Sequence, residues 1–143
     1  MKAAYRVLAG LVAIGVVLQA MFIAWGFFTV DKDVDGGAVI AKNSTPDVTG
    51  LSLHGAFGMT LIPIVALLLL IVSFFAKVDG GIKWALFVVG LVVLQIALAF
   101  VSFGAPVVGL LHGLNAFALA AVASLASRRA SRVHTPATET TTV

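Results

Sequence analysis

Four long apolar runs, separated by short polar segments, dominate the pattern of hydrophobic and polar positions. They cover approximately residues 6–30, 51–76, 83–103 and 107–127. A helix that crosses the hydrocarbon core of a bilayer needs about 20 apolar residues, and each run reaches that length. The pattern therefore predicts an all-α integral membrane protein whose four transmembrane helices form one domain over residues 1–128.

The composition supports this class. Hydrophobic residues make up 61% of the chain and charged residues 10%, which is too apolar for a soluble domain of this size. The chain has no cysteine, which excludes disulfides, thiolate nucleophiles and Cys-ligated metal or iron–sulfur sites. The first run is longer than the apolar region of a signal peptide, so we expect it to be retained as a helix.

The basic residues predict the orientation of the helices. With the N-terminus in the cytoplasm, seven of the nine Lys and Arg residues lie inside, and only Lys32 and Lys42 lie outside. We therefore expect both termini to be cytoplasmic in a multi-pass protein of the cell's inner (plasma) membrane. The sequence pI of about 9.7 then reflects topology, and no nucleic-acid partner is implied.

The polar segments between the runs are the expected connections. Residues 31–50 form an outer loop, 78–82 a tight inner turn built on Asp-Gly-Gly, and 104–106 an outer turn. Such short turns make consecutive helices antiparallel neighbours. Residues 129–143 are rich in Thr, Ser and Arg and predict a disordered cytoplasmic tail.

Two short motifs recur along the chain. Val-Val-Leu-Gln ends at Gln19 and again at Gln95, and Leu-His-Gly is centred on His54 and again on His112. Aligning them pairs the first predicted helix with the third and the second with the fourth. The sequence thus predicts an antiparallel four-helix bundle of two repeated helical hairpins, related by a pseudo-two-fold axis along the membrane normal. His54 and His112 would then face each other at similar depth.

A histidine within an apolar helix is costly and usually has a role. Two histidines on different helices are a common way for membrane bundles to hold a b-type haem, which makes His54 and His112 the candidate iron ligands. A structural role, in which each ring bonds a loop, headgroup or neighbouring helix, is the main alternative. Zinc or copper needs three or four donors, and no further ligand lies near that depth by sequence.

Other polar and small residues near the histidines complete the candidate haem site. Glycines on the same faces would leave room for a flat macrocycle, although small residues also let bare helices pack closely. These glycines are Gly55, Gly58, Gly109 and Gly113. Gln19 and Gln95 are expected to be interhelical hydrogen-bond donors that also reach a cofactor edge. Asn115 is placed to bond a propionate, a carbonyl or a quinone oxygen.

Three further sequence features bear on the fold and on the function. Pro63 is expected to kink its helix, because it removes the bond to the Met59 carbonyl. The alternating Asp31, Asp33 and Asp35 predict a solvated loop, since the segment lacks the closing Glu of a calcium loop. No predicted span carries an acid or base within its core, which argues against an ion-coupled transporter.

The helix order, with His54 and His112 near the outer ends of the second and fourth helices, resembles one half of a haem A synthase. It is also similar to small uncharacterised actinobacterial four-helix membrane proteins. The resemblance spans approximately residues 6–127 and implies haem binding at these two histidines. The haem A synthase family uses a glutamate in its first outer loop for catalysis, and residues 31–50 contain none. The resemblance therefore implies a haem protein and does not extend to hydroxylation.

The sequence favours a small b-type haem-binding membrane protein that transfers electrons or carries haem near the outer face, without catalytic activity of its own. Expected partners are the lipid bilayer and either a membrane redox complex or further copies of the chain. Two alternatives stay open. One is a cofactor-free four-helix subunit of a larger membrane complex, and the other is a quinone- or lipid-binding membrane protein.

Overall fold

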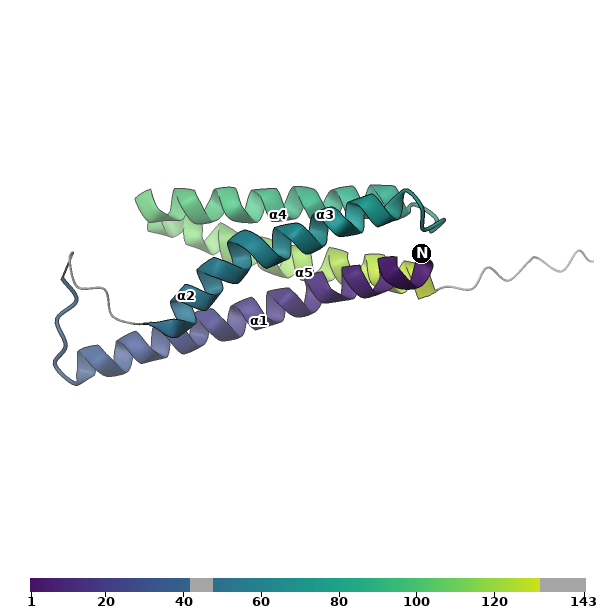
Figure 1. The fold of residues 1–143 in the computed structure, drawn as a ribbon. Helices are drawn as coiled ribbons and strands as arrows, with labels where there is room; N and C mark the ends of the chain where they lie inside the picture. The colour runs from purple at the N-terminus through teal and green to yellow at the C-terminus, as the bar shows by residue number, and fades with distance from the viewer. Residues whose placement is uncertain (42–47, 132–143) are drawn as a thin grey trace, which may run out of the picture.

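The computed structural model describes residues 1–41 and 48–131 and contains no β-strand within them. Four long helical rods lie side by side (Figure 1). The second rod is built from three consecutive segments, and a short 3₁₀ helix precedes the fourth. The elements are α1 (Lys2–Asp35), α2 (Thr49–Ala56), the π-helical η1 (Phe57–Leu61), α3 (Ile62–Ser73), α4 (Gly81–Gly104), the 3₁₀-helical η2 (Pro106–Val108) and α5 (Gly109–Ser131).

All four rods are long and apolar enough to cross a membrane, which confirms the number of helices predicted from the apolar runs. Their ends differ from the prediction. The acidic segment expected to open the outer loop is still helical, because α1 continues to Asp35. The last helix also continues to Ser131, beyond the predicted start of the tail, and its final turn carries Arg128 and Arg129, which interact favourably with the C-terminal end of the helix dipole. The rest of the predicted tail, residues 132–143, lies outside the described residues.

Two tight connections reverse the chain. Gly80 precedes α4 with a left-handed φ of 63°, which glycine adopts without strain, and the Gly81 N–H donates to the Val78 carbonyl at 2.9 Å. At the opposite end of the bundle, Pro106 opens η2, where its missing N–H needs no partner. The outer connection lies at the predicted turn, whereas the inner connection begins earlier than predicted, because α3 ends at Ser73 and α4 begins at Gly81.

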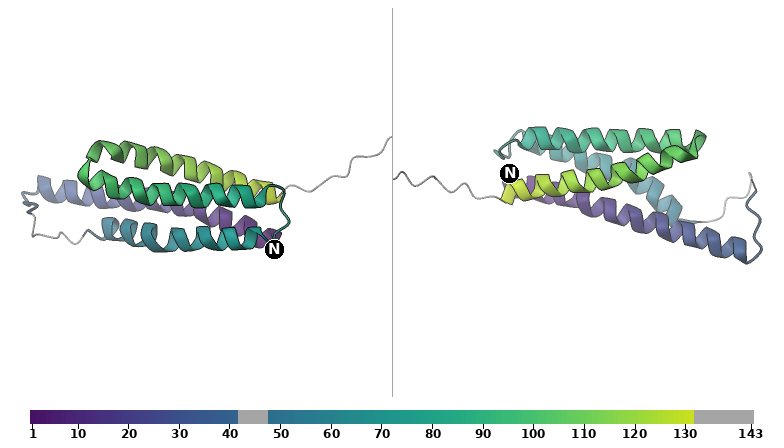
Figure 2. Two further views of the ribbon diagram at one scale, coloured as in Figure 1. Left: turned by 90° about the horizontal axis from the view of Figure 1, so that it is seen from above. Right: turned by 180° about the vertical axis from the view of Figure 1, so that it is seen from behind.

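The rods form a four-membered ring of antiparallel neighbours. The α1 helix packs against α2 and α3 on one side and α5 on the other, whereas α4 packs against α3 and α5 (Figures 1 and 2). Hence α1 lies diagonally opposite α4, and the α2–α3 rod lies diagonally opposite α5. This order is the one that a pseudo-two-fold relation between the two hairpins requires. The N-terminus and the end of α5 lie at the same end of the bundle, here named the termini end (Figure 1).

The tightly packed core lies toward the termini end. Each rod contributes buried residues, many of them alanines that let helices approach closely. The fully enclosed members include Tyr5, Ala9, Val12, Ala66, Leu69, Ala85, Val88, Ala123 and Ala126. The Tyr5 hydroxyl donates to the Gly81 carbonyl at 2.9 Å, and the Arg129 guanidinium lies 4.6 Å from the centre of the Trp84 ring. This end holds the four rods together, whereas both glutamine–histidine pairs lie in the other half of the bundle.

Pro63 changes the second rod without breaking it. The residues just before it form the π-helical η1, in which the Ile62 N–H donates to the carbonyl of Phe57, five residues back. Proline has no N–H to give to the Met59 carbonyl, and a wider turn accommodates this loss. The sequence predicts a kink at Pro63, and the structure has a π-helical turn there, inside a rod that is continuous from Thr49 to Ser73.

Candidate functional site: two imidazoles at the centre of the bundle

Two histidine rings from diagonally opposite rods meet in the half of the bundle away from the termini end. His54 comes from α2 and His112 from α5, and both are half-buried. Their ring centres are 6.2 Å apart, and the ring planes are inclined by 63° in an edge-to-face arrangement. The structure thus brings together the two histidines of the Leu-His-Gly repeats.

In the second hairpin, Gln95 of α4 holds the imidazole of His112 on α5. The ring Nδ1 lies 3.0 Å from the backbone carbonyl of Gln95, and the ring Nε2 lies 3.1 Å from the side-chain Nε2 of Gln95. One tautomer satisfies both contacts, because Nδ1–H donates to the carbonyl while Nε2 accepts from the amide. The Gln95 amide also donates to the His112 carbonyl at 3.0 Å. The prediction that Gln95 is an interhelical hydrogen-bond donor is confirmed.

In the first hairpin, Gln19 of α1 holds His54 of α2 in a related way. The ring Nδ1 lies 3.1 Å from the Gln19 backbone carbonyl. With the Gln19 amide oriented so that both of its ends are satisfied, its Nε2 lies 2.7 Å from the same Nδ1 and 3.0 Å from the His54 carbonyl. An Nδ1–H tautomer donates to the backbone carbonyl, whereas an Nε2–H tautomer accepts from the amide. Gln19 is therefore also an interhelical partner of its histidine.

The Gln19 amide lies between two backbone groups of the second rod. Its Nε2 donates to the His54 carbonyl and its Oε1 accepts from the Gly58 N–H at 2.7 Å. An uninterrupted α-helix would bond these two backbone groups to each other. Gly58 belongs to the π-helical η1, so the irregular turn before Pro63 coincides with the place where the glutamine side chain bonds the backbone.

Asn115 extends the network in the second hairpin only. Its Nδ2 donates to the Leu91 carbonyl at 2.9 Å and to Gln95 Oε1, and the residue is 7% exposed. Phe57 occupies the corresponding position, three residues after the histidine, in the first hairpin and packs edge-on against Phe22 with ring centres 5.4 Å apart. The two hairpins therefore share the glutamine–histidine pair and differ in the residue one turn beyond it.

The four candidate glycines have unequal surroundings. A Cβ atom added at Gly55 or Gly113 would meet open space. At Gly58 it would come within 3.5 Å of the Gln19 amide, and at Gly109 within 3.9 Å of the Ser102 hydroxyl, which are ordinary contact distances. No close approach of protein atoms requires glycine at these four positions, so clearance for a macrocycle stays a prediction.

The described residues form no metal site with three or more protein ligands. Within residues 1–41 and 48–131, no three side chains of His, Cys, Asp or Glu come together as a metal would require. Asp31, Asp33 and Asp35 lie in the last turns of α1, so the predicted solvated loop begins only after Asp35. A pair of imidazoles is the donor set of a haem, whereas zinc or copper takes three or more protein ligands.

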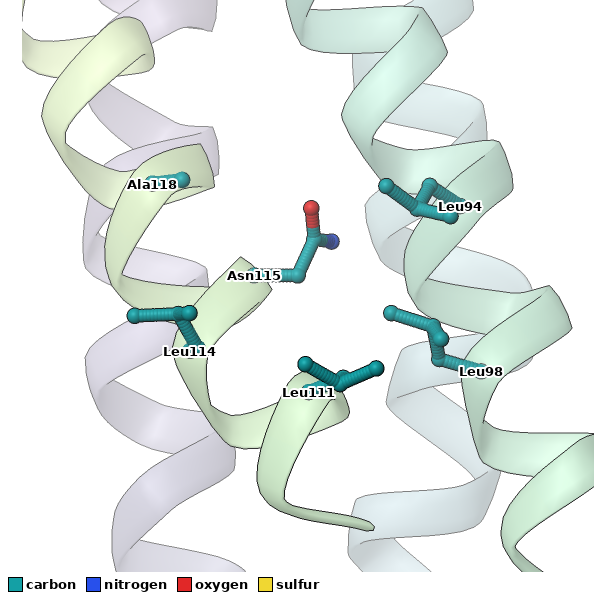
Figure 3. A pocket seen from close by; sticks show the side chains of 6 residues that line it. All are labelled: Leu94, Leu98, Leu111, Leu114, Asn115 and Ala118. Carbon is teal, nitrogen blue, oxygen red and sulfur yellow. The ribbon is translucent and has the colours of Figure 1, made fainter. Parts of the chain in front are cut away.

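An apolar groove of about 330 Å³ lies between α4 and α5. It is lined by leucines and one alanine, with Asn115 extending from α5 among them (Figure 3). The sequence reasoning did not identify this groove. The helical spacing of its leucines, four residues apart in α4 and three apart in α5, is a signal that marks one face of each helix. The lining residues are Leu94, Leu98, Leu111, Leu114, Asn115 and Ala118.

Comparisons of the chain with models of protein families, with curated proteins and with solved structures give no match.

Proposed function

We propose that the chain is a membrane protein that binds haem b through His54 and His112 and uses it for electron transfer or haem carriage. The separation of the two rings is the observation that carries the proposal. A metal ion bound between two imidazole nitrogens at about 2.0–2.1 Å each separates the ring centres by about 6 Å. The observed ring centres are 6.2 Å apart, a separation that suits a shared metal ion and equally a direct edge-to-face contact between the rings.

The partners of the ring nitrogens also suit iron ligation. Metal-bound histidines usually donate their second ring N–H to a carbonyl or carboxylate, which fixes the tautomer and orients the ring. In both pairs, Nδ1 lies within 3.1 Å of the backbone carbonyl of the partner glutamine. In the Nδ1–H tautomer, Nε2 is the nitrogen left for iron, and for His54 this tautomer requires the Gln19 amide N–H to give up its contact with Nδ1. The glutamine residues act as positioning residues.

The two histidines differ in the hydrogen bonding of their Nε2 atoms. No hydrogen bond to His54 Nε2 is found in the described part of the chain, whereas His112 Nε2 accepts from Gln95. Iron binding at His112 therefore replaces one hydrogen bond, whose net contribution is about 1 kcal/mol. A bound haem supplies one-electron redox chemistry. The protein supplies the two imidazoles, their orientation and the apolar surroundings.

The proposed setting is the plasma membrane, with both termini in the cytoplasm. The excess of Lys and Arg at the termini end supports this orientation. The histidine pair then lies in the outer half of the bilayer, nearer to an extracytoplasmic electron donor or acceptor. The surrounding partners are lipids, together with a membrane redox complex or other copies of the chain.

A cofactor-free role as a subunit of a membrane complex is the second candidate. The hydrogen bonds of the second hairpin favour it, because Gln95 bonds both His112 and Asn115, and every side-chain nitrogen or oxygen sealed from solvent in the described chain has a partner. A quinone- or lipid-binding role concerns the groove rather than the histidines.

Haem content per chain tests the proposal. The full-length protein is purified in detergent from haem-replete cells, and its absorption spectrum is recorded in oxidised and reduced states. We expect a Soret band, with an α band on reduction, and loss of both in His54→Ala and in His112→Ala. His134→Ala, which removes the third histidine of the chain, is the matched control and should retain both bands. A folded, colourless wild-type protein would favour the cofactor-free subunit.

A further inference from the structure

The groove between α4 and α5 contains one polar side chain with an unused acceptor. Both donor sites of the Asn115 amide are occupied, one by the Leu91 carbonyl and the other by Gln95 Oε1. No hydrogen bond to Asn115 Oδ1 is found among the described residues, although the side chain is more than nine-tenths buried. Every side-chain oxygen that is sealed from solvent in that part of the chain has a partner, so the unpaired Oδ1 keeps a small exposed surface.

The hydrogen-bonding state of Asn115 selects the ligand chemistry. An incoming polar group must donate a hydrogen bond, because Oδ1 is an acceptor and both N–H groups are already used. A hydroxyl satisfies this condition, whereas a carbonyl placed at Oδ1 would bring two acceptors together. The groove would therefore distinguish a hydroquinone or phenol from the corresponding quinone.

The rest of the groove selects an apolar body. Its other lining residues are aliphatic, and Leu111 and Leu114 are 53% and 65% exposed on the outer surface of the bundle. In a bilayer, that surface faces lipid, so a ligand reaches Asn115 from the membrane without crossing water. A volume of about 330 Å³ is at the small end for ligand sites and suits one ring with the start of a tail.

We propose that the groove binds the head group of a membrane-soluble hydroquinone or phenol. One ligand hydroxyl donates to Asn115 Oδ1, and the apolar tail lies along the leucines of α4 and α5. The inference stands on the groove and on Asn115, and it does not require haem at the histidines.

Equilibrium binding to the full-length protein in lipid nanodiscs tests the inference. The probes are a decyl-substituted hydroquinone, its oxidised quinone and its dimethyl ether, which share one tail. We expect the hydroquinone to bind about five- to tenfold more tightly than the other two, because they lack the donated hydrogen bond. Equal binding of the three probes would indicate partitioning into lipid alone, and a preference for the quinone would reverse the assigned roles. Either result overturns the inference.

Two variants locate the site. Leu114→Trp fills the groove without altering the Asn115 amide and should abolish the preference for the hydroquinone. Leu67→Trp adds the same bulk at an exposed leucine on α3, outside the groove, and should leave it unchanged. Asn115→Leu should make the three probes equivalent. If that variant does not fold, the dimethyl ether and Leu114→Trp still decide the matter. A hydroquinone preference that survives Leu114→Trp contradicts the assignment to this groove.

The haem absorption spectrum distinguishes the proposal of haem binding from the proposal of hydroquinone binding in the groove. Leu114→Trp should retain the Soret band of the wild-type protein while losing selective hydroquinone binding. A colourless protein that still prefers the hydroquinone would retain this inference and remove the haem proposal.

Discussion

Both hairpins contain a glutamine–histidine pair, but the hydrogen bonds of the glutamine side chain differ between them. In the first, the Gln19 amide bonds the His54 carbonyl and the Gly58 N–H inside a π-helical turn. In the second, α5 is a regular helix, and Gln95 bonds the His112 carbonyl and the side chain of Asn115. A polar side chain in an apolar bundle must be satisfied, and an irregular backbone and an additional polar residue are two ways to achieve it.

This difference also gives the two imidazoles different availability. His112 Nε2 accepts a hydrogen bond from Gln95, whereas no protein partner of His54 Nε2 is found within the described ranges. If both rings bind one iron through Nε2, His112 must release the Gln95 amide from Nε2, whereas His54 must release the Gln19 amide from Nδ1 and take the Nδ1–H tautomer.

The largest expected effect is on the stability of the bundle when each of the two glutamines is replaced by leucine. Gln95→Leu should destabilise the folded bundle by about 2 kcal/mol, because it removes three side-chain hydrogen bonds and leaves the buried Asn115 with an unpaired N–H. Gln19→Leu should cost about half as much, since the His54 carbonyl and the Gly58 N–H can then bond each other. Reversible unfolding in detergent mixtures measures both losses. Equal losses, or a larger loss for Gln19→Leu, would contradict the described asymmetry.

A smaller effect is expected on haem binding. Gln95→Ala frees His112 Nε2 before iron arrives and should raise haem affinity about fivefold, provided that the variant is folded. Gln19→Ala removes a hydrogen bond to Nδ1 of His54 and none to the Nε2 of either histidine, so it should raise the affinity less than Gln95→Ala does. Titration of the haem-depleted proteins with haem, followed by the Soret absorbance, measures the difference. A similar rise in both variants would show that Gln95 does not compete with iron.

The smallest expected effect concerns the π-helical turn. Pro63→Ala supplies an N–H for the Met59 carbonyl and should favour an α-helical turn, with a change in stability below about 1 kcal/mol. The Gly58 N–H would then bond the His54 carbonyl rather than Gln19, and its hydrogen exchange should slow relative to wild type. Ile64→Ala, at an exposed neighbouring position, is the control. Unchanged exchange at Gly58 in Pro63→Ala would show that the proline does not maintain the π-helical turn.

Much of the fold follows from local patterns in the sequence. Uninterrupted apolar runs identify the four rods, because helix length and hydrophobicity are properties of each segment alone. The ends of the rods were less predictable. Asp31 to Asp35 and Arg128 to Ser131 are polar yet helical, since a helix continues into water when its terminal turns carry suitable residues.

The residue types of the candidate site could be predicted from the sequence, but only part of its geometry could. The repeated Gln and His are informative because polar residues are rare in these runs, and the structure brings each glutamine to its histidine. The contact between Asn115 and Gln95 depends on the axial register of α4 against α5, which the sequence pattern does not specify. The groove likewise depends on how leucines of two helices are juxtaposed.

The central claim, that His54 and His112 bind the same iron, is tested most directly by the coordination of the purified protein's haem. Electron paramagnetic resonance and resonance Raman spectra of the ferric wild-type protein should show a six-coordinate, low-spin iron with two imidazole ligands. The single variants His54→Gly and His112→Gly, supplied with imidazole in solution, should each regain that signature. A five-coordinate or haem-free wild-type protein, or variants that keep the two-imidazole signature without added imidazole, would contradict the account.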